Sequence, residues 1–165
     1  MIVVAPLHEV EEARRVWAPS HAVGMASPGA EMFDFPDDIQ SLRLTFHDIV
    51  TARDGLQSVT DTDVARLLAF AAEWPRTAPL LVQCWAGVSR SPAAAYVIAC
   101  QIAGPGHEER LALRLREVAP FATPNARLVA LADEALDRRD AMIVAIDRIG
   151  RGAETAMGRT FVLQF

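Results

Sequence analysis

Short apolar runs alternate along the chain with longer segments in which apolar residues recur at helical spacing. Runs rich in β-branched and other apolar residues predict strands at 2–5, 21–25, 42–46 and 79–82. Apolar positions three or four residues apart predict helices at 8–17, 60–73, 91–103, 108–118, 125–136 and 140–149. This alternation favours an α/β domain with a mostly parallel central sheet, helices on both faces and extra helices towards the C-terminal end.

Turn and cap residues sharpen several of these boundaries. Thr60 or Asp61 suits the N-cap of the helix that follows, and Pro92 fits the first turn of a helix, where its missing N–H costs nothing. The run 104–106, Gly-Pro-Gly, ends that helix. Residues 160–165 are apolar enough to pack against the domain, but the sequence does not identify their partner.

Composition indicates an ordinary globular protein. The chain has 165 residues, of which 52% are hydrophobic and 22% charged. This length suits one domain, and this balance suits one packed core rather than a disordered chain. We therefore expect residues 1–165 to form a single domain.

Charge and hydropathy weigh against two classes of partner. The net charge is −5, and the 16 basic residues, all Arg, are scattered rather than gathered into the basic face that nucleic-acid binding needs. No apolar run reaches the length of a membrane span, and the first apolar segment has no basic region before it. We expect a cytoplasmic protein that binds neither nucleic acid nor membrane.

The chemistry concentrates between the strand at 79–82 and the helix at 91–103. Cys84 and Arg90 bracket five residues there, with Gly87 inside the segment and Ser91 directly after it. Two cysteines in the whole chain make neither a disulfide framework nor a metal cluster, which fits a reducing compartment. The strand and helix on either side give this Cys-to-Arg spacing a specificity that it would lack alone.

A loop of this kind is suited to a phosphate group. Its backbone N–H groups can turn inward towards an anion, helped by the positive end of the following helix, and Gly87 allows a close or unusual backbone. Arg90 adds a planar fork for two phosphate oxygens. A thiol at a helix N-terminus beside an Arg is readily ionised, which makes Cys84 a candidate nucleophile. The phosphate-binding residues are then Trp85, Ala86, Gly87, Val88, Ser89 and Arg90.

Residues 84–91 resemble the active-site loop of the cysteine-based protein tyrosine phosphatase superfamily. The small bacterial dual-specificity-like branch fits best, because 116–125, from Arg116 to Pro124-Asn125, resembles the segment after the active-site helix in those enzymes. The resemblance covers about residues 42–133. It implies a phosphatase that forms and then hydrolyses a cysteinyl-phosphate without metal or organic cofactor, and a loop that also binds phosphate, sulfate or vanadate.

The resemblance also implies a general acid and a supporting hydroxyl. In similar enzymes an Asp upstream of the Cys, just after a strand, protonates the leaving oxygen; Asp48 occupies that place and Asp54 is the reserve. A turn or helix-capping role is the alternative for Asp48. Ser91 matches the hydroxyl that donates to the cysteine sulfur; an N-cap is the other role open to it, and both could hold at once.

One departure from the family keeps other functions open. The family has His before the Cys, whereas this chain has Gln83, an amide that can donate a hydrogen bond but carries no charge. A weak or inactive phosphopeptide-binding pseudophosphatase is therefore one alternative, and a rhodanese-like or Cdc25-like enzyme is another. The neutral loop side chains favour phosphotyrosine or another simple phosphomonoester over an inositol phosphate. Cys100, within the predicted helix at 91–103, is interpreted as a buried structural residue.

Overall fold

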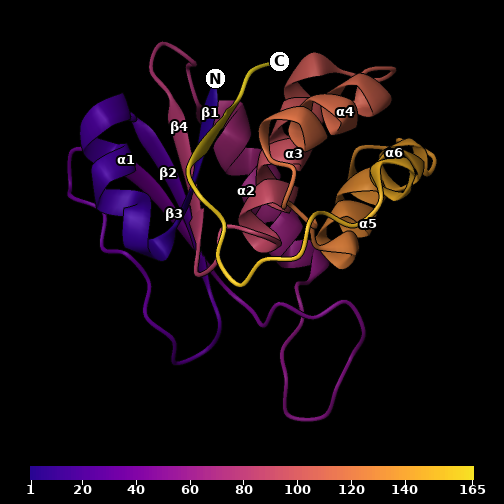
Figure 1. Cartoon of the computed structure of the whole chain (residues 1–165), viewed down its shortest axis with the longest axis horizontal. Helices are drawn as coiled ribbons and strands as arrows, with labels where there is room; N and C mark the ends of the chain where they lie inside the picture. Colours follow the sequence, from indigo (N-terminus) through magenta and orange to yellow (C-terminus); the bar gives the residue numbers. More distant parts are fainter.

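A five-stranded sheet in the order β3-β2-β4-β1-β5 forms the centre of the computed structural model, which describes all residues 1–165. The strands are β1 (Ile2–Pro6), β2 (His21–Ala26), β3 (Gln40–Thr45), β4 (Leu80–Cys84) and β5 (Phe161–Leu163). The first four, which Figure 1 labels, are parallel, and β5 runs antiparallel to β1. The predicted α/β fold with a mostly parallel sheet is confirmed.

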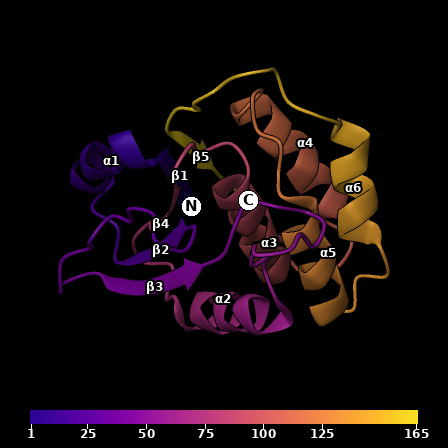
Figure 2. The same cartoon turned by 90° about the horizontal axis from the view of Figure 1, so that it is seen from below.

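Helices cover both faces of this sheet, unequally. The short 3₁₀ turn η1 (Leu7–Glu9) leads into α1 (Val10–Trp17), which packs on one face around a small cluster that includes Val3, Val10 and Leu81. The other face carries α2 (Asp61–Glu73), α3 (Arg90–Ala103), α4 (Glu108–Val118), α5 (Ala126–Ala135) and α6 (Ala141–Ile149). Figure 2 shows this division clearly, with α1 alone on its side.

The helix α3 lies at the centre of the larger layer. Every residue from Arg90 to Cys100 is buried, because the helix packs on β1 and β4 and is itself covered by α2, α4 and α5. Its run of small and apolar residues, Pro92 to Ala95 and Val97 to Ala99, permits such close packing on several sides. The first residue of this helix is therefore fixed by the core itself.

Two helix starts follow from identifiable caps. Thr60 forms a capping box at the start of α2, in which its side chain accepts from the Asp63 amide and the Asp63 carboxylate accepts from the Thr60 amide. Asn125 caps α5 by accepting from the Leu128 amide at 3.0 Å. Thr60, rather than Asp61, is thus the N-cap of α2.

The C-terminal residues return from α6 to the far edge of the sheet. Residues 150–160 cross the molecule and lead into β5, which pairs with β1 (Figure 2). The partner that the sequence did not identify is thus β1. Among the helices, none is long and apolar enough to cross a membrane.

Candidate active site

The segment from Cys84 to Arg90 joins the carboxyl end of β4 to the start of α3. Cys84 is the last residue of β4, which lies between β2 and β1. The carboxyl edge of a parallel sheet is where α/β proteins bind their ligands. We call residues 84–90 the phosphate loop, for the ligand that its sequence predicts.

Four carbonyl groups of the phosphate loop accept hydrogen bonds from amides of three other segments of the chain. The Trp85 carbonyl accepts from the Leu7 amide at 3.0 Å, and the Ala86 carbonyl from the Gly158 amide at 2.8 Å. The carbonyls of residues 88 and 89 accept from the amides of Thr123 at 2.8 Å and Asn125 at 3.3 Å. The loop is thereby held open from the outside.

This arrangement determines where the loop amides point. In a planar trans peptide the carbonyl of one residue and the N–H of the next point in opposite directions. The N–H groups of Ala86, Gly87, Ser89 and Arg90 therefore face the interior of the loop. One of them has a partner there, since the Gly87 amide donates to Cys84 Sγ at 3.3 Å. These four N–H groups form an inward-facing set of donors of the kind that suits an anion.

Position 87 requires a glycine for two reasons, the backbone conformation there and the lack of space for a Cβ. Its φ of +70° belongs to the left-handed region, and a Cβ there would lie 3.1 Å from the Pro6 nitrogen and 3.2 Å from the Pro6 Cβ. Any larger residue would be strained and would press on the end of β1.

Cys84 and Ser91 are in direct contact at the base of the loop. Cys84 is 2% exposed, and its sulfur lies 3.0 Å from Ser91 Oγ, with either atom able to donate. Ser91 is the second residue of α3, and the N-cap position belongs to Ser89, which makes no side-chain capping bond. The N-cap alternative for Ser91 is therefore wrong.

Arg90 is oriented by the backbone and by an aromatic ring. Its Nη1 donates to the Phe46 carbonyl at 2.9 Å and to Ser27 Oγ at 3.4 Å, and its guanidinium lies 5.9 Å from the centroid of the Phe46 ring. Its Nε is buried without a hydrogen-bond partner, and its Nη2 makes no hydrogen bond to the protein. The side chain of Arg90 is 7% exposed.

Asp48 is brought to the phosphate loop by two side-chain donors. Its Oδ1 accepts from Ser89 Oγ and from Asn125 Nδ2, each at 2.7 Å, and its Oδ2 lies 3.9 Å from Arg90 Nε. Asp48 caps no helix. Asp54, the reserve candidate, is exposed beside the turn at Gly55 and makes no hydrogen bond or ion pair with the loop.

Three residues that contact Asp48 or Arg90 were not predicted from the sequence to do so. Asn125 was visible as part of a Pro-Asn pair before a helix, which predicted its place but not its contact with Asp48. Phe46 and Ser27 hold Arg90 from the ends of two neighbouring strands. No local pattern marks them, because one acts through its backbone carbonyl and the other lies in an irregular loop.

Gln83 does not make the hydrogen bond expected of its amide. Its side chain is fully buried, and neither Nε2 nor Oε1 has a hydrogen-bond partner. The amide lies instead on the side of β2, with Oε1 3.5 Å from the position that a Cβ on Gly24 would take. The side chain therefore supplies no donor to Cys84.

Three hollows border the phosphate loop. The one of about 290 Å³ lies beside Val88 and residues 151–155, and the other two contain candidate catalytic residues. One of about 250 Å³ is lined by Ala26, Ser27, Ala30, Glu31, Trp85 and Arg90. The other, of about 390 Å³, includes Asp48, Ser89 and Asn125. Trp85 is 57% exposed, so its ring stands at the mouth of the loop rather than in the core.

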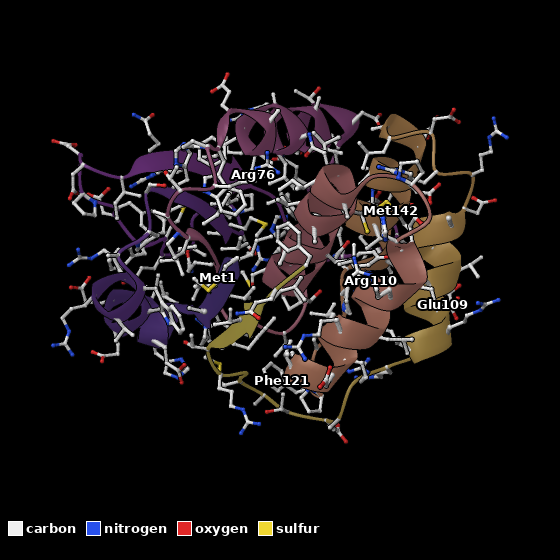
Figure 3. The ribbon with its side chains drawn as sticks, turned by 90° about the horizontal axis from the view of Figure 1, so that it is seen from above. Met1, Arg76, Glu109, Arg110, Phe121 and Met142 are labelled. Atoms are coloured by element: carbon white, nitrogen blue, oxygen red, sulfur yellow. The ribbon has the colours of Figure 1, made fainter.

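A larger hollow of about 850 Å³ lies elsewhere. It is formed by α4 and the last two residues of the chain and contains Glu109 and Arg110, which Figure 3 labels on that helix. It includes neither cysteine nor any phosphate-loop residue. No group of three or more His, Cys, Asp or Glu side chains is placed to hold a metal ion.

Comparison with known proteins supports the fold. No family model matches the sequence, and no curated protein matches it either. Among solved structures, the chain is similar to the crystal structure of DUSP15, with a TM-score of 0.56 and 16% sequence identity. The similarity covers 90% of this chain and 92% of that one. The fold is therefore that of a dual-specificity phosphatase.

Proposed function

We propose that this protein is a cysteine-dependent phosphomonoester hydrolase of the protein tyrosine or dual-specificity type, formed by residues 1–165 as one phosphatase domain. The observation that carries the proposal is the position of Cys84 Sγ at the base of a loop whose amides face inward. Arg90 and Asp48 stand at the same loop. A nucleophile, anion donors and a carboxyl group in this arrangement match the needs of phosphoryl transfer through a covalent intermediate.

The reaction proceeds in two displacements. The Cys84 thiolate attacks phosphorus, the bond from phosphorus to the ester oxygen breaks, and Asp48 gives its proton to that oxygen. A water molecule then attacks the cysteinyl-phosphate, Asp48 takes a proton from it, and sulfur leaves as thiolate. Ser91 Oγ, 3.0 Å from the sulfur, donates to the departing thiolate in this second step.

The two carboxylate oxygens of Asp48 have different surroundings and therefore different roles in the proposed reaction. Oδ1 already accepts from Ser89 and Asn125, whereas Oδ2 has no hydrogen-bond donor and faces Arg90 at 3.9 Å. Oδ2 is therefore the oxygen that carries the transferable proton. Arg90 binds two phosphate oxygens with Nε and Nη2 while Nη1 remains on the Phe46 carbonyl.

The substrates that we propose are phosphotyrosine in proteins or another simple phosphomonoester. The hollow beside Arg90 has Trp85 on one side, which offers an aromatic surface to the organic part of an ester. Inorganic phosphate, sulfate and vanadate would compete for the loop. A reducing cytoplasm would keep Cys84 in the state that the mechanism needs.

Two rival functions make different predictions. A pseudophosphatase would bind phosphopeptides without turnover, and its support is the position before Cys84, where Gln83 supplies no donor to the sulfur. A rhodanese-like or Cdc25-like enzyme would need no acid at Asp48. The contacts of Asp48 with Ser89 and Asn125 support the phosphatase over the second rival.

The test is release of phosphate from an aryl phosphate by the wild type and by Cys84→Ser. We expect turnover in the wild type and none in Cys84→Ser, while vanadate or substrate binding persists because the amides and Arg90 remain. Measurable turnover by Cys84→Ser would contradict the covalent mechanism. Binding without turnover in the wild type would favour the pseudophosphatase.

A further inference from the structure

The C-terminal strap, defined as residues 150–160, crosses the outside of the phosphate loop. Figure 1 shows the segment after α6 passing below α3 before it turns along β1, and Figure 2 shows the same course around the edge of the molecule. Its one backbone hydrogen bond to the phosphate loop comes from Gly158, whose amide donates to the Ala86 carbonyl at 2.8 Å.

That hydrogen bond acts on the peptide that faces the nucleophile. The Ala86 carbonyl and the Gly87 amide belong to one planar peptide, so a donor that holds the carbonyl outward also holds the N–H inward. The Gly87 N–H donates to Cys84 Sγ at 3.3 Å. A connected path thus runs from Gly158, through one rigid peptide, to the sulfur.

The fit at residue 158 leaves no room for a side chain. A Cβ there would lie 2.6 Å from Phe121 Cε2, 3.1 Å from the Gly87 carbonyl oxygen and 3.2 Å from that of Ala86. Figure 3 shows Phe121 beside the C-terminal segment. The absence of a Cβ lets the strap approach the loop closely enough to hydrogen-bond it.

Both ends of the strap are anchored. Arg116 Nη2 donates to the Gly150 carbonyl at 2.6 Å, and the Ala153 amide donates to the Pro120 carbonyl at 2.9 Å. At the other end, the amide and hydroxyl of Thr160 both donate to Glu9 Oε2 at 2.7 Å. The donor at Gly158 is therefore held at a fixed distance from the loop.

We propose that Gly158 is a positioning residue for the reaction: through the Ala86 carbonyl it orients the Gly87 amide towards the Cys84 thiolate and the phosphate. The proposal rests on the proposed function for its effect on catalysis. Its effect on the reactivity of the sulfur is independent of turnover.

The test compares Gly158→Ala with Leu163→Ala. The second variant removes side-chain volume from β5, where Leu163 is fully buried, and leaves the contact with Ala86 untouched. For each protein the rate of Cys84 alkylation is measured at about pH 6 and about pH 9, together with kcat and KM for an aryl phosphate and the melting temperature. Arg90 and Asp48 face the loop, Glu31 shares a hollow with Trp85 and Arg90, and Arg151 and Glu154 of the strap share a hollow with Val88 and Ser89. All of these charged side chains are the same in both variants.

We expect the ratio of the two alkylation rates, lower pH over higher, to fall by up to about tenfold in Gly158→Ala, the effect of one weakened hydrogen bond to a charged sulfur. The same variant should lose kcat. In Leu163→Ala the melting temperature should fall while the ratio stays at the wild-type value. Cys100 does not confuse the measurement, because it is fully buried and burial raises the pKa of its thiol to about 12.

A folded Gly158→Ala protein with the wild-type ratio and kcat would overturn the proposal, as would an equal fall of the ratio in Leu163→Ala. If Gly158→Ala does not fold, a semisynthetic chain with glycolic acid at position 158 removes the N–H donor without adding an atom to the side chain. An unchanged ratio in that protein would also overturn it. A wild type that releases no phosphate would refute the proposed function, while the alkylation ratio would still decide the role of Gly158.

Discussion

The nucleophile and the acid of the proposed site are held in opposite ways. The phosphate loop around Cys84 has one exposed residue, Trp85, and is fixed through its backbone by amides from three other segments. Asp48 lies at the start of a segment whose residues 50–57 are all exposed. It reaches the loop through its own side chain, which binds Ser89 and Asn125.

This difference suits the two tasks. A thiolate and its anion donors must already be in place when the phosphate arrives, because reorganising them during the reaction would add to the barrier. An acid must approach one oxygen, release a proton and later take one back, so a side chain on a less constrained segment is adequate. The proposed nucleophile is therefore preorganised by the fold, and the proposed acid by two side-chain hydrogen bonds.

The largest effect among the following variants is expected on the acid side. Asp48→Asn keeps the shape but removes the transferable proton, so kcat should fall by about 10²–10⁴ for an ester with a poorly acidic leaving group. For a nitrophenyl-type leaving group, which departs with little protonation, the loss should be smaller. The measurement is the ratio of kcat for the two esters in each protein.

Asp54→Asn is the matched control for that experiment. Asp54 is exposed and makes no contact with the phosphate loop, so its kinetics should equal those of the wild type. If Asp54→Asn shows the dependence on leaving group and Asp48→Asn does not, the assignment of the acid is wrong. Equal losses for both esters in Asp48→Asn would indicate a positioning role.

On the nucleophile side, Arg90→Lys tests whether geometry or charge matters. Lysine keeps the positive charge but cannot reach the Phe46 carbonyl and two phosphate oxygens at once, so we expect kcat to fall by about 10²–10³ and KM to rise. Steady-state kinetics with an aryl phosphate measures both. Wild-type kinetics would remove Arg90 from the site.

The hydrogen bond between the two sides is tested by Ser89→Ala. Ser89 donates to Asp48 Oδ1, and Asn125 remains as a second donor, so kcat should fall only about three- to tenfold, the effect of losing one hydrogen bond. Ser89 is the cleaner choice, since Asn125 also caps α5. A loss as large as that of Asp48→Asn would mean that Ser89 acts directly on the phosphate.

The smallest effect on catalysis is expected from a substitution of Gln83, the residue of β4 that precedes Cys84. Gln83→Met replaces a buried, unpaired amide with an apolar side chain of similar size, so the free energy of unfolding should rise by about 1–3 kcal/mol. Urea denaturation measures this change, and phosphate release should stay near the wild-type rate. A loss of stability would show that the amide has a partner in solution.

Features set by residues close together in the sequence could be predicted, whereas contacts between residues far apart in the sequence could not. The strands, the helices and the loop could be predicted because their patterns are local, as in the apolar run before Cys84 and the Pro92 helix start after it. Asp48 could be nominated from its place beyond a strand, but not its contacts, since Asn125 is 77 residues away from it in the chain. The course of the strap could not be predicted from the sequence. It is set by the pairing of β5 with β1, and these strands lie far apart in the sequence, so no local pattern reveals the pairing.

The outward hydrogen bonds of the phosphate loop also bear on when the site can form during synthesis. The Trp85 carbonyl is held by Leu7, near the start of the chain, and the Ala86 carbonyl by Gly158, near its end. A nascent chain whose residue 158 is still inside the ribosome can build β1, β4 and α3, but it lacks the donor for the Ala86 carbonyl. Since contacts of long sequence separation form late and at an entropic cost, Cys84 gains its final surroundings only after residue 158 has left the ribosome.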